Sequence, residues 1–431
     1  MLDIAAQTRR RRRTTAVSFA VLAVIALVIT GFAVKYPGLS PSEVDVSNGG
    51  VWVRDEAAGL VARVNVDAGE LDARLTVAGE DLEIIQDGYT VLLIDARWIT
   101  PVNTASVQRD PLVDLTPGST VRLGHDRVAI ASPEGKVWIL SPGQVPGFSP
   151  AEVEPAYTTG GSAAEIVVGS DGTVFVLDGT TLMTFPHADD PGRTTAAEPA
   201  ELDALSTAAD QVQLSAVGNV PVLLDAENSM LRLGVSGMEH DLAADGIGSL
   251  DDAELQQAGP AADDVVLATE SALVRVPLAG GEARESAAGA PGTPVPPAQV
   301  GSCAYGAWTQ SNLYVRACDG AEAMVASVPD ADSSADLALR VNRGLVVLND
   351  QGSGLSWKIA EDMELVDEGR EDKGTGTGTV TLDMRQEGET PGPQAAADAV
   401  TTVQVGGGWK PPVEAHLHAS LPSGHEGRRI P

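Results

Sequence analysis

Eight recurrences of one β-hairpin pattern, their spacing near 40–45 residues and an uncharged N-terminal stretch predict the fold class. The chain of 431 residues is expected to be all-β: a β-propeller of about seven or eight blades, preceded by one N-terminal transmembrane helix. We expect a cytoplasmic Arg-rich stub at 1–15, the transmembrane helix at 16–34, a linker at 35–46, the propeller at 47–362, and an acidic, Gly- and Pro-rich linker and disordered tail at 363–431.

The N-terminus predicts a membrane anchor. Arg9–Arg13 is a block of five arginines, and residues 16–34 (AVSFAVLAVIALVITGFAV) carry no charge. As a helix this stretch would be roughly 28 Å long, about the thickness of a bilayer core. The arginines predict a single-pass protein of the cell membrane, with its N-terminus cytoplasmic and its C-terminal domain extracytoplasmic. A cleaved signal peptide is the alternative, because Gly31-Phe32-Ala33 resembles a cleavage site.

The charge of the chain excludes one class of partner. The formal net charge is −32, although the N-terminus is rich in arginine. An acidic surface of this kind repels phosphate backbones, so no nucleic-acid partner is expected.

The hairpin pattern is an apolar triplet, a short polar turn and a second apolar run, as in RVAIASPEGKVWIL (127–140). The first apolar residues of the eight units lie 32 to 48 positions apart; they are Val51, Val91, Val128, Val174, Val222, Val265, Leu313 and Leu345. A single blade buries neither of its faces, whereas a closed ring buries both faces of every blade. The short final spacing favours ring closure by one blade shared between the first and last hairpins. Two stacked β-sandwiches are the alternative fold, which the regular spacing disfavours.

Loops and turns of the predicted propeller suggest where function could lie. Asp95, Asp178, Asp225 and Asn349 follow apolar triplets and are interpreted as structural turn residues rather than calcium ligands. The long Pro-, Ala- and Gly-rich segments 142–163, 186–210 and 284–300 are expected to project from the rims. Such loops are either a binding surface or tolerated insertions.

The two cysteines, Cys303 and Cys318, flank strand-like text. An exported location permits a disulfide, and we expect one bridge between neighbouring strands. Two buried free thiols are the alternative, and no four-ligand zinc pattern surrounds them.

No standard catalytic spacing is present, so no catalytic, cofactor-binding or metal-binding residue is predicted. The segment DADSSAD (330–336) lacks the glycine and terminal acid of a calcium loop. The remaining candidates have simpler interpretations. The single histidines are interpreted as surface residues: His125, His187 and His240. The hairpin tryptophans are expected to pack between blades rather than stack on sugars: Trp52, Trp98, Trp138 and Trp357. The tail histidines have no framework to hold a metal: His416, His418 and His425.

Four stretches carry a resemblance to a known family: RRRRRTTAVSFAVLAVIALVITGFAV, GGVWVRDEAAGLVARVN, LEIIQDGYTVLLID and RVAIASPEGKVWILSP, followed by the acidic AEDMELVDEG. They resemble actinobacterial membrane-anchored cell-envelope proteins of the fibronectin type III and Ig-like repeat family, over roughly residues 9–370. The resemblance implies an N-terminal propeller-like portion followed by an array of such modules. That array is missing here, which places in doubt any function that it carries.

These features together predict a non-enzymatic binding or scaffold module of the bacterial cell envelope, tethered to the membrane by its helix. Its partner would be a protein or a cell-wall polysaccharide, bound through the rim loops. The alternative is an extracellular carbohydrate-active enzyme, a glycoside hydrolase or lyase, that uses carboxylates of the central channel. A calcium- or cofactor-binding sensor is a third hypothesis, and no cofactor is predicted.

Overall fold

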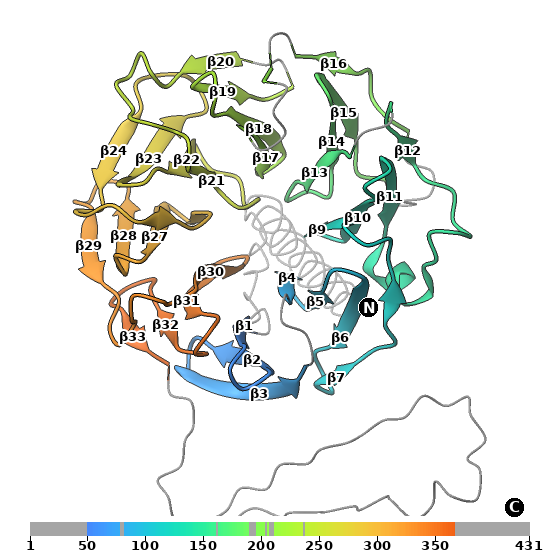
Figure 1. Ribbon diagram of the computed structural model, residues 1–431, viewed down its shortest axis with the longest axis horizontal. Coiled ribbons are helices and arrows are strands. Elements are labelled where there is room, and N and C mark those ends of the chain that lie inside the picture. The colour runs from blue at the N-terminus through green and yellow to red at the C-terminus, as the bar shows by residue number, and fades with distance from the viewer. Residues whose placement is uncertain are drawn as a thin grey trace, which may run out of the picture. The chain divides into compact units, whose positions relative to one another are not determined.

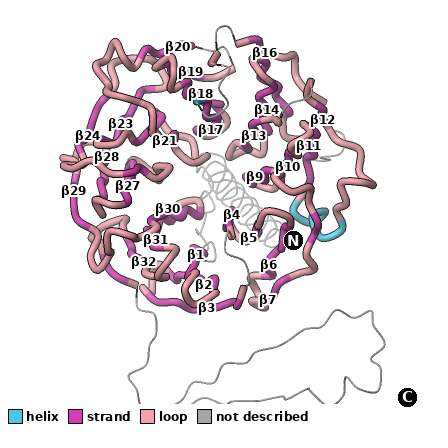
Figure 2. Tube along the Cα trace, viewed as in Figure 1, coloured by secondary structure: helices cyan, strands magenta, loops and turns pink. Residues whose placement is uncertain are grey.

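The computed structural model describes residues 50–366, except 78–81, 161–162, 189–194, 203–204, 207–210 and 236–237. These residues form eight antiparallel sheets arranged in a ring around a central axis (Figure 1). They consist of strands and loops with one short 3-10 helix (Figure 2). The predicted all-β propeller is confirmed, and its blade number is eight.

Blades one to four follow the order of the chain. The first contains β1 (Val51–Asp55), β2 (Leu60–Asn65) and β3 (Glu70–Thr76); the second β4 (Glu83–Asp87), β5 (Thr90–Ile94), β6 (Trp98–Asn103), β7 (Gln108–Arg109) and β8 (Val113–Asp114); the third β9 (Thr120–Gly124), β10 (Arg127–Ala131), β11 (Lys136–Leu140), the helix η1 (Pro142–Gly147) and β12 (Tyr157–Thr158); the fourth β13 (Glu165–Val168), β14 (Val174–Asp178), β15 (Thr181–Phe185) and β16 (Ala200–Glu201).

Blades five to eight continue in the same way. The fifth contains β17 (Val212–Val217), β18 (Val220–Asp225), β19 (Met230–Leu233) and β20 (Met238–Asp241); the sixth β21 (Glu254–Leu255), β22 (Asp264–Ala268), β23 (Ala272–Pro277) and β24 (Arg284–Ala287); the seventh β25 (Thr293–Pro294), β26 (Ala298–Val300), β27 (Cys303–Thr309), β28 (Leu313–Cys318) and β29 (Met324–Ser327); the eighth β30 (Leu337–Asn342), β31 (Leu345–Asp350), β32 (Ser356–Lys358) and β33 (Glu364–Leu365). The last strand ends beyond residue 362, the predicted end of the propeller.

The apolar triplets form strands that are buried on both faces. In β10, Val128 and Ile130 join the hydrophobic cluster shared with the second blade, whereas Ala129 and Ala131 join the cluster shared with the fourth. Alternate side chains therefore pack against opposite neighbours. This is why the triplets are apolar at successive positions instead of alternating.

The seventh blade explains the irregular spacing of the last three hairpins. The predicted unit at Leu313 is the hairpin of β28 and β29, the third and fourth levels of its blade, and not the second and third as elsewhere. The strand equivalent to the other triplets is β27, CAYGAWT, which carries Gly306 between two aromatic residues. The pattern missed it because a tyrosine, a glycine and a tryptophan replace the aliphatic residues.

The ring does not close through a shared blade, so that expectation was wrong. The first and eighth blades are separate sheets, and the first has three described strands. The inner edge of β1 is instead capped by side-chain amides from its neighbours. Asn349 accepts from Arg54 N at 2.9 Å and donates to Arg54 O at 3.1 Å, and Gln86 accepts from Trp52 N at 3.0 Å. Asn342 Nδ2 donates to Gly50 O at 2.8 Å.

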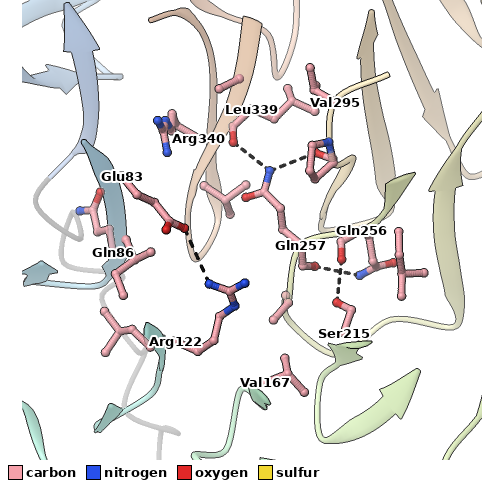
Figure 3. A pocket seen from close by; sticks show the side chains of 18 of the residues that line it. Glu83, Gln86, Arg122, Val167, Ser215, Gln256, Gln257, Val295, Leu339 and Arg340 are labelled. Carbon is pink, nitrogen blue, oxygen red and sulfur yellow. Dashed lines mark hydrogen bonds and ion pairs between the residues drawn. The ribbon is translucent and has the colours of Figure 1, made fainter. Parts of the chain in front are cut away.

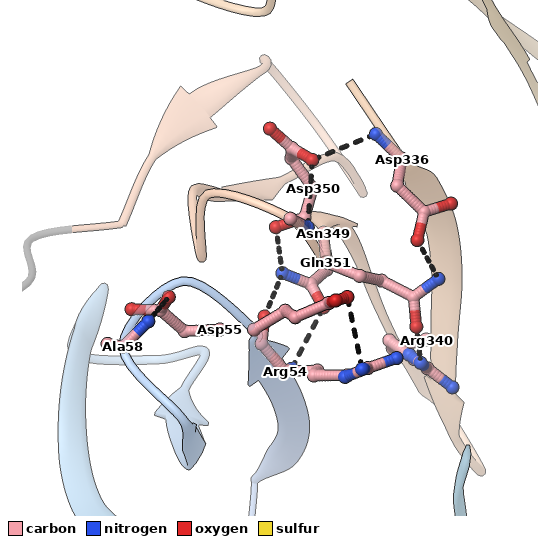
Figure 4. Close-up of polar contacts among 10 residues, drawn as sticks. Arg54, Asp55, Ala58, Asp336, Arg340, Asn349, Asp350 and Gln351 are labelled. Atoms are coloured by element: carbon pink, nitrogen blue, oxygen red, sulfur yellow. Dashed lines mark hydrogen bonds and ion pairs between the residues drawn. The ribbon is translucent and has the colours of Figure 1, made fainter. Parts of the chain in front are cut away.

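Among the described residues, amide side chains therefore bond the backbone edge of β1 at the ring junction. Figure 4 shows the part around Arg54 and Asn349, where strand β31 of the last blade meets β1 of the first. The inner strand of the second blade, β4, in turn contacts β30 of the eighth. Around the axis, the eighth, first and second blades are therefore joined by these amide side chains and by the contact between β4 and β30.

The predicted disulfide is confirmed: Cys303 and Cys318 are bonded and pair across β27 and β28. The long segments depart from the prediction of projecting loops. Segment 284–300 supplies β24, β25 and β26, and segment 142–163 supplies η1 and β12, with Val145 fully buried. Part of 186–210 lies outside the described residues.

The predicted membrane helix at 16–34, the Arg block and the tail lie outside the described residues. Among the residues that are described, no helix is long and apolar enough to cross a bilayer. The chain divides into two compact units, Met1–Val366 and Asp367–Pro431, and all described residues belong to the first.

Candidate functional site

A channel along the propeller axis is the candidate functional site. Its cavity has a volume of about 1440 Å³, and side chains from all eight blades line it. Since each blade is built in the same order, the inner strands run in the same direction along the axis. Their first residues therefore gather at one mouth, here called the strand-start mouth. The turns that follow them gather at the other, the turn mouth.

The strand-start mouth carries four carboxylates from four different blades. Glu83, Glu165 and Glu254 are the first residues of β4, β13 and β21, and Asp336 directly precedes β30. Burial raises the pKa of Glu254. Burial, together with the charge of Asp350, raises the pKa of Asp336. These two carboxyls hold a proton more readily than an exposed acid does.

The turn mouth is formed by the tight turns that follow the inner strands of the blades. His125 and Arg343 adopt positive φ values of 52° and 53° at the tips of their turns. Arg343 Nε lies 2.8 Å from Asp87 Oδ1, so this pair joins the eighth blade to the second. This ion pair thus helps to hold the ring together at the turn mouth.

Two further arginines line the channel between the mouths. Arg122 Nη1 lies 3.8 Å from Glu83 Oε1, and Figure 3 shows the Glu83 carboxylate turned toward it. Arg340, on β30, donates from Nη1 to Ile84 O at 3.2 Å and from Nη2 to Gln351 Oε1. Both arginines are half-buried and lie on the side of the channel formed by the second, third and eighth blades.

The facing wall is rich in amides that bridge blades. Gln257 Nε2 donates to Pro296 O at 3.1 Å and to Leu339 O at 2.9 Å, so one side chain reaches two blades (Figure 3). Ser215 Oγ donates to Gln256 O at 2.6 Å. These amides fix the channel wall by contacts within the protein.

The remaining lining is mainly aliphatic. Five half-buried side chains line the channel; they are Ile85, Leu123, Val212, Leu214 and Val341. Trp52 and His125 are the aromatic residues among the described lining. Few rings are therefore available for stacking on sugars, and the channel offers hydrocarbon surface instead.

Asp95 and Asp225 hold their turns, as predicted: Asp95 accepts from Arg97 N at 2.8 Å and Asp225 from Asn228 N at 3.2 Å. Asp178 and Asn349 instead bond neighbouring blades, because Asp178 accepts from the Tyr157 hydroxyl at 2.9 Å and Asn349 accepts from Arg54 N at 2.9 Å. In the 330–336 segment, Asp332 makes a local turn bond, since it accepts from Ser334 N at 2.7 Å. Over the described part of the chain, no group of three or more His, Cys, Asp or Glu side chains is arranged to hold a metal ion.

The predicted aromatic packing holds for three of the four hairpin tryptophans. Trp52, Trp138 and Trp357 are buried, whereas Trp98 is 37% exposed. Among the histidines, His125 lies in its predicted turn, but His240 lies in strand β20 and pairs with Asp245 at 2.8 Å. The tail histidines lie outside the described residues.

Arg340 and Gln257 were not singled out by the sequence. Each sits in a stretch that also fits an ordinary half-buried strand or its end, and no motif marks it. Their shared signal is position: each follows the start of an inner strand by three residues.

No family model matches the chain, and no curated protein matches it. Solved structures do. A dihydro-heme d1 dehydrogenase, NirN, in complex with DHE has a TM-score of 0.53 at 13% identity, covering 73% of this chain and 72% of that one. BamB from Moraxella catarrhalis has a TM-score of 0.47 at 12% identity, covering 73% and 92%. Virginiamycin B lyase from Staphylococcus aureus, as a catalytically inactive variant with quinupristin, has 0.45 at 14%, covering 64% and 92%. At these identities the likeness concerns the fold alone, and by that fold the chain is an eight-bladed β-propeller.

Proposed function

We propose that this protein is a membrane-tethered, extracytoplasmic β-propeller that acts as a non-enzymatic binding or scaffold module in the bacterial cell envelope. The uncharged stretch at 16–34 behind Arg9–Arg13 supports the tether, and the family resemblance of the sequence supports the envelope location. The partner would be a protein or a cell-wall polysaccharide at the rims and the channel.

One observation carries the proposal: most charged and amide groups of the channel are committed to joining blades. Asp87 pairs with Arg343, and Gln257 bridges Pro296 and Leu339. Groups held in this way stabilise a rigid ring, which suits a binding surface.

A second candidate function is the carbohydrate-active enzyme, because burial raises the pKa of Glu254 inside the channel. A carboxyl with a raised pKa suits a general acid. Asp336 also has a raised pKa, but the acid beside it, Asp350, accepts from Asp336 N at 2.9 Å and Gly352 N at 3.2 Å. Asp350 is thus a turn residue and not a free catalytic partner.

The test is a binding screen of the full chain, purified in lipid nanodiscs, against cell-wall glycans, with product analysis of each glycan. Saturable binding with every glycan intact supports the binding module. A shortened glycan overturns it, and loss of that product in the Glu254→Gln variant would assign the chemistry to the channel.

A further inference from the structure

The junction between the eighth, first and second blades forms a distinct part of the channel wall. The first blade has no described strand inside β1, so β30 and β4 approach one another there. Ile84 of β4 lies at the centre of this place. Trp52 packs in the same hydrophobic cluster as Ile84, and Arg340 donates to the carbonyl oxygen of Ile84.

Arg340 carries a positive charge that no carboxylate neutralises directly. Within the described residues, no acid lies at ion-pair distance from its guanidinium. The two acids whose charges reach it have other partners: Glu83 pairs with Arg122, and Asp336 accepts from Gln351 Nε2 at 3.1 Å. A half-buried charge without a counter-ion is costly, which makes an external anion favourable there.

Arg340 also has unused donors. Its hydrogen bonds to Ile84 O and to Gln351 use two of the five N–H groups of the guanidinium. Its Nε is buried and has no acceptor among the described residues. Burial lowers the pKa of Arg340 to about 10, so the side chain stays cationic at neutral pH.

Trp52 supplies a second donor without an acceptor. Its side chain is 1% exposed, it lines the channel, and its Nε1 has no hydrogen-bond partner among the described residues. Burying an N–H group without an acceptor lowers stability, because the group has lost its hydrogen bond to water. Trp52 packs in the cluster of Ile84 and Arg340 bonds the Ile84 carbonyl, so two buried donors without acceptors lie near this residue.

The rest of the channel supplies an aliphatic surface, and its acidic residues favour one position for an anionic group. Ile85 and Leu123 lie beside this junction, and Leu214 lies across the channel. Glu165 and Glu254, on the fourth and sixth blades, repel an anion from the facing wall. A ligand with one anionic head and an aliphatic chain would satisfy each of these surfaces.

We propose that the channel binds an aliphatic carboxylate or an alkyl phosphate, with its head group on Arg340 and the Trp52 N–H and its chain along the aliphatic lining. This inference rests on the proposed function only in treating the channel as a binding site. Its structural alternative is that Arg340 merely ties β30 to β4.

The experiment uses probes that share one chain and differ in head group: decanoate, decyl phosphate, decyl trimethylammonium and decyl glucoside. Titration calorimetry with the full chain in nanodiscs is expected to give binding of the two anions at least about tenfold tighter than of the cation or the glucoside. Preference for the carboxylate over the phosphate, or the reverse, identifies the head group. Inorganic phosphate tests whether the anion alone suffices.

Two variants locate the head group. Arg340→Gln is expected to weaken decanoate binding about tenfold while leaving decyl glucoside unchanged, so that the preference disappears. Arg343→Gln is the matched control: it removes the same charge from the same channel, but Arg343 pairs with Asp87. Its effect on decanoate should stay within about twofold.

Trp52→Phe removes the indole N–H and keeps a smaller aromatic ring in the buried cluster, so it tests the site even if the Arg340 variant folds poorly. We expect a loss of a fewfold for decanoate, and a downfield shift of the Trp52 indole N–H signal on binding to the unsubstituted protein. Equal binding of all four probes, or a preference that survives Arg340→Gln, overturns the inference. Glycan or protein binding in the same preparations would then still support the proposed function.

Discussion

Asn349 is expected to be the side chain whose loss most weakens the closure of the ring. It is fully buried in the eighth blade, and its amide accepts from Arg54 N and donates to Arg54 O, 295 positions away in the chain. Asn349→Ala leaves both backbone groups of Arg54 buried without their partners. At about 1–3 kcal/mol for each unsatisfied group, the loss is roughly 3 kcal/mol of unfolding free energy or more.

Urea unfolding followed by tryptophan fluorescence measures this loss. Asn103→Ala is the matched control, because Asn103 also accepts two backbone N–H bonds, from Ala105 at 3.2 Å and Ser106 at 3.1 Å. Those bonds are exposed and local, so that variant should lose less than about 1 kcal/mol. If Asn349→Ala costs no more than Asn103→Ala, amide capping of β1 does not close the ring.

Three further changes test other parts of the fold. Removing the bridge with Cys303→Ala and Cys318→Ala opens a loop of 15 residues and should lower the unfolding free energy by about 3 kcal/mol, with reducing agent then having no further effect on thermal denaturation. Glu254→Gln should raise the melting temperature at neutral pH. The folded pKa of Glu254 is raised, so the wild type regains stability as pH falls through it, and the two curves should converge in acid. Gly306→Ala places a Cβ 2.9 Å from Leu273 Cδ1 and should cost about 1–3 kcal/mol in denaturant unfolding, and an unchanged midpoint would show that the blades can separate there.

The propeller fold could be predicted from the sequence because burial between blades gives a strong periodic pattern of apolar residues. Seven of the eight triplets lie in strands at the same level of their blades, as Val128 in β10 and Val222 in β18 illustrate. The eighth unit was misplaced because β27 reaches the same burial with Tyr305 and Trp308 around a glycine. The inner strand β25 was not predicted because it lies in the Pro-rich segment 293–297, and proline is atypical of strands.

The channel could not be predicted in the same way, for a physical reason. An inner strand has one edge toward the axis, so its residues follow neither the alternating pattern of a half-exposed sheet nor the apolar run of a buried one. Glu83, Ile84 and Ile85 are consecutive in β4, yet one is exposed, one buried and one half-buried. Trp52 packs in the cluster of Ile84, and Arg340 bonds the Ile84 carbonyl, so closure of the ring and not either local segment brings them near one another.

Three strands of the first blade are described, and none of them lies inside β1. An inner strand at that place would pair with β1. Without one among the described residues, the polar edge of β1 is satisfied by Gln86, Asn342 and Asn349, and Arg340 can reach across to Ile84. Arg340 thus lies in the channel wall with no carboxylate at ion-pair distance among the described residues, although the charges of Glu83 and Asp336 reach it. Asn349 bonds Arg54 of the first blade, whereas Arg340 bonds Ile84 and Gln351, so Asn349→Ala should lower stability and Arg340→Gln should change ligand preference.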